Sequence, residues 1–351
     1  MSKFYKKFFL WFALFSPIYI VLILSCTLRA NVDLYLPGNL TDVSKEVVVD
    51  GYKNKLNGSV SSVYVMDIRK PTYFTYALST VFPFSASSYI TKSSDASYDR
   101  ELNYAIGVHD SEKSFNDASL AAFEALGDKI NFSYKEVTYI YRADKTIIST
   151  MKYTEVVGKT IKRVDLIDSD YPTLEVVYEH LSGLSAGESV SMVLEDSKKK
   201  EYPVTFTKRE DSTFGLTTAR DYMIIDSPEV SVKNVFTQGP SGGAMQALYI
   251  YLLLSDEDLL KGRKIAGTGT IGYDKTNLYP DMAFGVVGAI GCVGQKLYSA
   301  YQDHAKVFYC PESNYSECMN YYNKYGFDEN DIRVVSVKTL SDILNDLRST
   351  N

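Results

Sequence analysis

The stretch GPSGGAM, residues 239–245, is the strongest indication of the fold of the C-terminal part of this chain. Glycines surround Ser241, and the apolar run that follows predicts a helix beginning within a few residues of it. A serine at such a turn has an exposed hydroxyl, and the N-terminal amides of the helix lie beside it. These features are needed for acyl transfer, so we expect Ser241 to be a catalytic nucleophile.

A serine needs a base to remove its proton, and the chain contains only 3 histidines. An α/β-hydrolase arrangement would combine Asp274 or Asp281 with His304, whereas a trypsin-like order would place His109 before Ser241. The sequence supports neither arrangement well. No run of alternating strands and helices precedes the serine, and His109 lacks small neighbours at the end of a strand.

Lys296 is a better candidate for the base. A helix over residues 292–301 would place Val293, Lys296 and Ala300 on one face, so the lysine would point inward among apolar neighbours. An unperturbed lysine is about three pKa units too basic to accept a proton near neutral pH, a cost of roughly 4 kcal/mol. Burial in a dry pocket can lower the pKa by that order. The alternative is an exposed lysine on an amphipathic helix.

Three further stretches extend the pattern around these residues. They are KGRKIAGTGTI (residues 261–271), VGAIGC (287–292) and KVFYCP (306–311), the last of which predicts a strand. Together with GPSGG (239–243), they resemble the catalytic domain of Lon-type Ser-Lys peptidases. The similarity is closest to the membrane-anchored branch of Gram-positive bacteria that carries a PDZ domain and no ATPase. This resemblance implies that Ser241 is the nucleophile, Lys296 the base, and Thr268 the hydroxyl that steadies the lysine.

The chain also departs from the family pattern. The family usually has alanine or another small residue at 242 and glycines at 292 and around 238, where this chain has Gly242, Cys292 and Gln238. Residues 272–285 are also longer than the equivalent turn. All of these differences lie at the rim of the expected site. They leave open an alternative class, a binding or scaffold protein built on an inactive peptidase fold.

The N-terminal region predicts a membrane anchor. Residues 8–28 form an almost uninterrupted apolar run, and about 20 apolar residues suffice to cross a bilayer. The run is preceded by Lys3, Lys6 and Lys7. By the positive-inside rule, everything after Arg29 should be outside the cytoplasm. A cleaved signal peptide and a lipoprotein-type signal ending at Cys26 are weaker alternatives, because neither has a clean cleavage site.

Two regions lie between the anchor and the expected catalytic domain. Residues 29–129 predict an α/β juxtamembrane region, with a strand over 60–66 and a helix over 115–126 that ends at Gly127. We expect this region to set the height of the catalytic domain above the membrane.

Residues 130–210 follow a pattern of strand, strand, helix and hairpin. The expected elements are strands over 137–141 and 160–164, a helix over 172–181, and a hairpin of 189–194 with 202–207. This pattern resembles a PDZ domain, which binds an extended peptide by strand addition. The family's carboxylate-binding glycine falls near Glu136, which would repel a peptide carboxylate. Peptide recognition and a spacer role therefore both stay open.

Composition and motifs exclude several function classes. The formal net charge of -6 argues against nucleic acid as a partner. Residues 158–160, Gly-Lys-Thr, lack the upstream glycine of a Walker A motif because Tyr153 stands there, so we expect no ATP. No Cys/His cluster has metal-ligand spacing, so we expect no metal or cofactor. Cys310 and Cys318 are either free thiols or one disulfide.

The sequence thus predicts an α+β protein of four segments. These are an anchor over 1–28, the juxtamembrane region over 29–129, a PDZ-like domain over 130–210, and a Lon-type peptidase domain over 211–351. The expected function is that of a single-pass membrane serine endopeptidase with an extracytoplasmic catalytic domain. It would cut exported peptides or membrane-protein segments without ATP.

Overall fold

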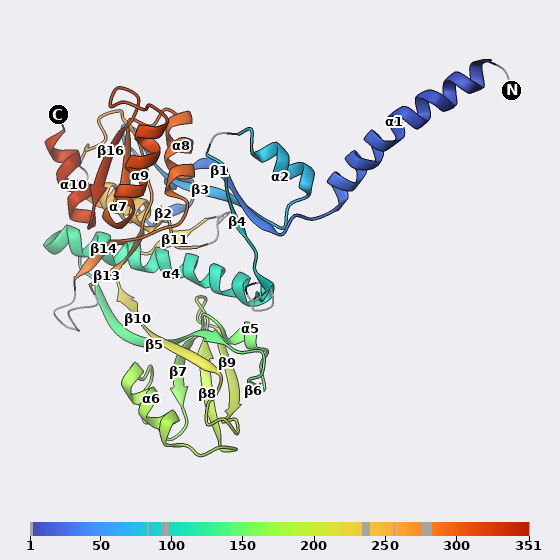
Figure 1. Cartoon of the computed structure of the whole chain (residues 1–351). Helices are drawn as coiled ribbons and strands as arrows, with labels where there is room; N and C mark the ends of the chain where they lie inside the picture. Colours follow the sequence, from blue (N-terminus) through green and yellow to red (C-terminus); the bar gives the residue numbers. More distant parts are fainter. Residues whose placement is uncertain are drawn as a thin grey trace.

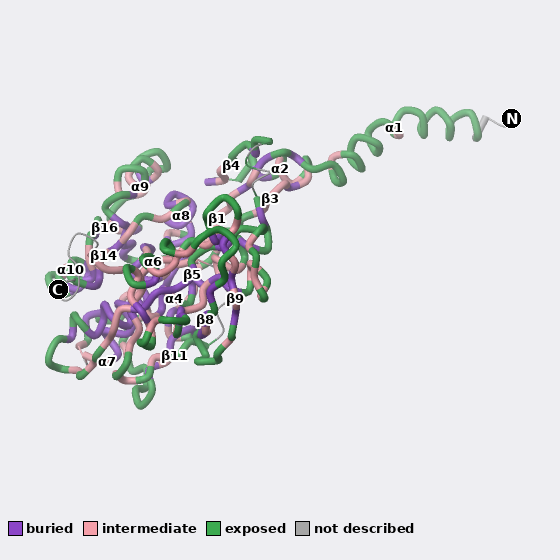
Figure 2. The backbone as a smooth tube through the Cα atoms, turned by 90° about the horizontal axis from the view of Figure 1, so that it is seen from below, coloured by how far each residue is buried: buried purple, intermediate pink, exposed green. Residues whose placement is uncertain are grey.

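The computed structural model describes residues 3–82, 84–92, 94, 98–233, 239–255, 257–274 and 283–350. Its first element, α1 (Lys3–Thr27), projects away from the folded body (Figure 1). Tyr5–Thr27 is long and apolar enough to cross a membrane, with a mean hydropathy of 2.2. Figure 2 shows that α1 is exposed along almost its whole length.

The first of two large sheets is mixed and has the strand order β16-β15-β12-β3-β1-β4. Its strands are β1 (Val32–Asp42), β3 (Ser59–Arg69), β4 (Ala86–Tyr89), β12 (Lys264–Gly267), β15 (Val307–Pro311) and β16 (Arg333–Val337). The strands expected over 60–66 and 306–311 are therefore confirmed. β12 pairs in parallel with both β3 and β15. Segments 29–129 and 211–351, expected to form separate domains, thus contribute strands to one sheet.

Helices cover both faces of this sheet. Because side chains alternate along a strand, Ile265 of β12 packs with α4 (Arg100–Leu126), α7 (Gly243–Ser255) and α10 (Leu340–Ser349). Its neighbour Ala266 packs with α8 (Val293–Gln302) and α9 (Glu312–Lys324) on the opposite face. The smaller elements are η1 (Val43–Lys45), β2 (Val47–Val49), α2 (Tyr73–Ser79), β11 (Val230–Val232), β13 (Thr270–Tyr273) and β14 (Phe284–Gly288).

α4 is much longer than the expected helix over 115–126. Its N-terminus is capped by Asp99, whose side chain accepts a hydrogen bond from the backbone N–H of Leu102 at 3.1 Å. The first half of α4 is rich in polar residues, so its apolar periodicity is weak in the sequence. The helix ends at Gly127, where φ is 56°, and this expected end is confirmed.

The second sheet is antiparallel throughout, in the order β10-β5-β7-β8-β9-β6. Its strands are β5 (Ser133–Ala143), β6 (Ile148–Ser149), β7 (Thr160–Val164), β8 (Ser189–Glu195), β9 (Glu201–Thr207) and β10 (Leu216–Asp226). The short helices η2 (Gly127–Lys129), α5 (Tyr153–Val156) and α6 (Leu174–Gly183) accompany it. The expected strands and the β8-β9 hairpin are confirmed, and α6 begins two residues after Pro172. β10 extends this sheet beyond residue 210.

A partly buried ion network connects the second sheet to α4. Lys113 of α4 lies 2.9 Å from Asp117 and 2.5 Å from Asp221 of β10. Burial alone would lower the pKa of Lys113, but the two carboxylates raise it overall and keep the amine charged. Asn116 also donates to the carbonyl of Tyr222 at 2.7 Å. α4 therefore holds both sheets together (Figure 1).

Candidate active site

Ser241 lies in a tight turn that leads into α7. Gly239 has a φ of 91°, which favours glycine, and its N–H donates to the carbonyl of Gly107 in α4 at 3.1 Å. At Gly243 a Cβ would come within 2.6 Å of Ser114 Oγ and 3.0 Å of the backbone nitrogen of Ile271. The glycines therefore let the turn that carries Ser241 pack directly against α4 and β13.

Lys296 reaches this turn from the first part of α8. Its side chain is only 3% exposed, and its Nζ lies 2.8 Å from Ser241 Oγ and 3.0 Å from Thr268 Oγ1. The helix expected over 292–301 is thus present, and the lysine points inward as its spacing predicts. The structure brings together all three residues that we expected at the site.

Thr268 follows β12 and is completely buried. Its Oγ1 donates to the carbonyl oxygen of Ser241 at 3.0 Å, and that carbonyl also accepts the N–H of Gly269 at 2.9 Å. With its proton committed to this carbonyl, the threonine oxygen presents a lone pair to the Nζ of Lys296. The hydroxyl therefore connects the lysine and the serine turn.

The environment of Lys296 favours a neutral amine. Burial lowers the pKa of Lys296 to about 8, and Cys292 opposes this shift. Among the residues that the structure describes, no carboxylate pairs with this lysine. At pH 7 a group with this pKa is unprotonated in roughly a tenth of the molecules, a fraction large enough for general-base chemistry.

The backbone amides of Ser241 and Gly242 are available to a ligand. The amides of Gly239 and Gly243 donate to the carbonyls of Gly107 and Pro240, both at 3.1 Å. In the described part of the chain, the amides of Ser241 and Gly242 have no hydrogen-bond partner. Two adjacent unpaired amides at the start of a helix can stabilise an oxyanion.

Two buried polar residues that the sequence analysis missed support the turn. Ser114 Oγ of α4 lies 3.3 Å from the carbonyl oxygen of Pro240 and 3.2 Å from Gln246 Oε1 of α7. Gln246 is a polar residue within an otherwise apolar helix, and both side chains are buried. In the sequence, a glutamine within the apolar run that follows Ser241 was the signal that could have indicated this supporting role.

Two of the positions that depart from the Lon-type pattern, 242 and 292, adjoin the turn of Ser241 and the helix of Lys296. Cys292 is the N-cap of α8 and has φ 60° and ψ 42°, a left-handed conformation that favours glycine. Burial raises the pKa of its thiol. A Cβ at position 242 would lie 3.3 Å from the Cβ of Ser62, so alanine would fit tightly there. Gln238, Asp281 and most of the long segment over 272–285 lie outside the described residues.

The histidines take no part in this arrangement. His109 is buried in α4 with its ring 4.6 Å from that of Tyr139, and burial lowers its pKa to about 4. His180 lies 3.7 Å from Asp165 at the second sheet, and His304 is exposed after α8. Within the described ranges none of them hydrogen-bonds Ser241. Both histidine arrangements therefore lack the contact that they require.

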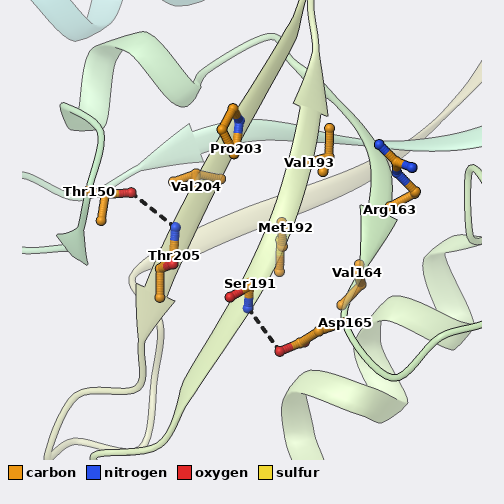
Figure 3. Close-up of a pocket in the computed structure, with 10 residues that line it drawn as sticks. All are labelled: Thr150, Arg163, Val164, Asp165, Ser191, Met192, Val193, Pro203, Val204 and Thr205. Atoms are coloured by element: carbon orange, nitrogen blue, oxygen red, sulfur yellow. Dashed lines mark hydrogen bonds between the residues drawn. The ribbon is translucent and has the colours of Figure 1, made fainter.

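The second sheet carries a separate groove of about 660 Å³ over β7, β8 and β9 (Figure 3). Asp165 accepts the N–H of Ser191 at 3.2 Å along its wall. The groove contains none of the three expected catalytic residues.

Glu136, expected to repel a peptide carboxylate, lies within β5 with its carboxylate 3.1 Å from the guanidinium of Arg220, which also pairs with Glu175. Its charge is therefore compensated locally.

The site contains no recognisable metal centre. No group of three or more His, Cys, Asp or Glu side chains in the described part of the chain could hold a metal ion. Cys310 and Cys318 are both free thiols in the core.

No family model matches the chain, and no curated protein matches it in sequence. Conclusions about its activity therefore rest on the geometry around Ser241.

Proposed function

We propose that this protein is an ATP-independent serine endopeptidase of the Lon-type Ser-Lys class, anchored in the membrane by α1. The observation that carries this proposal is the 2.8 Å contact between Ser241 Oγ and the buried Nζ of Lys296. A serine at a turn beside a lysine with a lowered pKa is the arrangement that general-base activation requires. Unpaired amides next to the serine supply the second requirement, a binding place for developing negative charge.

In the proposed reaction, neutral Lys296 accepts the proton of Ser241 while Oγ attacks the scissile carbonyl carbon. The amides of Ser241 and Gly242 donate to the oxyanion, and loss of one such donor typically costs about 3 kcal/mol. The ammonium then gives its proton to the leaving amine. Water hydrolyses the acyl-serine with Lys296 again as base. Throughout, Thr268 accepts an N–H from the lysine, which directs the nitrogen lone pair toward the serine.

The lysines before α1 favour a cytoplasmic N-terminus and an extracytoplasmic catalytic body. In this proposal the substrates are exported peptides or protein segments near the outer face of the membrane. The second sheet and α6 would form a PDZ-like module that acts as a spacer or binds extended peptide.

Cleavage by the purified full-length chain in detergent tests the proposal. The substrate is a library of unstructured peptides, and mass spectrometry identifies the new termini. We expect the parent to cut and Ser241→Ala to leave the library intact while keeping the parent's circular dichroism. Ser313→Ala, which removes an exposed hydroxyl on α9, is the matched control and should cut at the parent rate. An inactive parent, or an active Ser241→Ala variant, would contradict the proposal.

A further inference from the structure

The short helix α2 and the turn after it present apolar side chains to the outside. Val81 is 73% exposed and Phe82 is 55% exposed. The full set of large exposed apolar residues in this segment is Tyr73, Phe74, Leu78, Val81 and Phe82. No charged residue occurs between Lys70 and Lys92, although charged residues make up 23% of the chain. Such a concentration of exposed apolar side chains is unusual for a surface that faces water.

On α2 apolar side chains face outward and a polar one faces the protein, the reverse of a helix whose outer face contacts water. Phe74 and Leu78 are spaced by one turn and both face outward, whereas Ser79 is buried and donates to the carbonyl of Tyr76 at 2.7 Å. The helix is well formed, because Thr72 caps it by accepting the N–H of Thr75 at 3.1 Å. An apolar environment outside the protein accounts for this reversal.

α2 is tied directly to the end of the candidate membrane span. The N–H of Tyr73 donates to the carbonyl of Leu28 at 3.1 Å, and the N–H of Ala30 donates to that of Pro71 at 2.8 Å. Arg29, two residues after the end of α1, forms a β-bridge with Thr72. Figures 1 and 2 both show α2 beside the C-terminal end of α1. If α1 crosses a bilayer, α2 lies at its surface.

The same segment is also connected to the helix that carries Lys296. Phe84, directly beyond the turn, is buried and stacks on Tyr298 of α8 and on Tyr325, the C-cap residue of α9, with ring centroids 4.4 Å and 3.8 Å away. These contacts fix the apolar segment to the catalytic body.

We propose that residues 73–82 form a second membrane contact, inserted in the interfacial layer of the bilayer that α1 spans. An amphipathic segment in that layer buries its apolar face about 5–10 Å deep, and Tyr and Phe suit the boundary between headgroups and acyl chains. Arg29, which forms a β-bridge with Thr72 at the start of this segment, is exposed, and anionic lipid headgroups would attract it there. The body is thereby held against the membrane. Resting on the proposed function, this would restrict cleavage to chain segments close to the bilayer surface.

Tryptophan fluorescence of the full-length chain in vesicles tests this contact. The single tryptophan, Trp11, lies in α1, so a Trp11→Phe variant has no tryptophan emission. Phe82→Trp in this background reports on the patch. Tyr178→Trp, at an exposed aromatic position on α6, is the matched control. The vesicles contain phosphatidylcholine and phosphatidylglycerol, with or without acyl chains brominated near the headgroup.

We expect the Phe82→Trp emission to be blue-shifted and to be quenched several-fold more strongly by the brominated lipid than that of Tyr178→Trp. Equal, weak quenching at both positions would overturn the proposal. A blue shift at position 82 without lipid quenching would also overturn it, because a second copy of the chain would then cover the patch. The measurement requires no cleavage, so its failure is distinguishable from failure of the proposed enzymatic function.

Discussion

Replacing Thr268 by valine tests how the lysine is oriented. The substitution keeps the shape of the buried side chain and removes the oxygen that lies 3.0 Å from Lys296 Nζ. The carbonyl of Ser241 loses one donor but keeps the N–H of Gly269 at 2.9 Å, so the turn should stay in place. The substitution removes two hydrogen bonds, and each contributes about 1 kcal/mol of stability, so the fold should persist.

The effect should appear in the rate of cleavage. Without an acceptor at 268, the amine samples orientations in which its lone pair misses Ser241 Oγ. We expect kcat to fall by about one to two powers of ten, or 1.4–2.7 kcal/mol of barrier, with KM unchanged. Because a neutral acceptor also stabilises the ammonium form, its loss should move the acidic limb of the pH profile toward lower pH. A purely structural role would not produce that shift.

The assay is the initial rate of peptide cleavage between pH 6 and pH 9, at several peptide concentrations. Thr268→Ser restores the oxygen and should recover most of the rate. Thr270→Val, two residues away in β13, is the matched control and should behave like the parent. A Thr268→Val protein that cuts at the parent rate would refute the oriented-base reasoning.

Three further predictions follow from the same geometry. Burial lowers the pKa of Lys296 to about 8, and the base must be neutral, so kcat/KM should rise about tenfold per pH unit up to that pH. A maximum of kcat/KM below pH 6 would contradict Lys296 as the base. Cys292 has a left-handed φ of 60°, so Cys292→Gly should remove backbone strain and raise the free energy of unfolding, measured by urea titration, by about 0.5–1 kcal/mol. A lower free energy of unfolding would show instead that packing of the Cys292 side chain stabilises the fold. A protease added to intact cells should digest everything beyond Arg29 and leave a membrane-bound stub. Protection of the Ser241 region from that protease would place this region in the cytoplasm.

Local patterns predicted much of this molecule. The apolar spacing around Lys296 and the glycines around Ser241 indicate a helix and a turn without knowledge of the rest of the chain, and both are present. The β8-β9 hairpin and the end of α4 at Gly127 follow from similarly local signals.

Long-range pairing could not be predicted in this way. The parallel register of Ser59 with Lys264 joins two segments that are far apart in the sequence, and nothing in either segment specifies the other. The supporting pair Ser114 and Gln246 was missed for the same reason, because its members come from different helices. The polar first half of α4 hides its periodicity, so the helix was expected to be shorter.

In the proposed mechanism Lys296, and no histidine, activates Ser241. The most direct test is the cleavage rate of Lys296→Met, which fills the same buried space without an amine, alongside His109→Ala and His304→Ala. We predict that Lys296→Met cuts no peptide at any pH while its circular dichroism matches the parent, and that both histidine variants keep the parent rate. Full activity in Lys296→Met, together with loss of activity in either histidine variant, would contradict the Ser-Lys dyad.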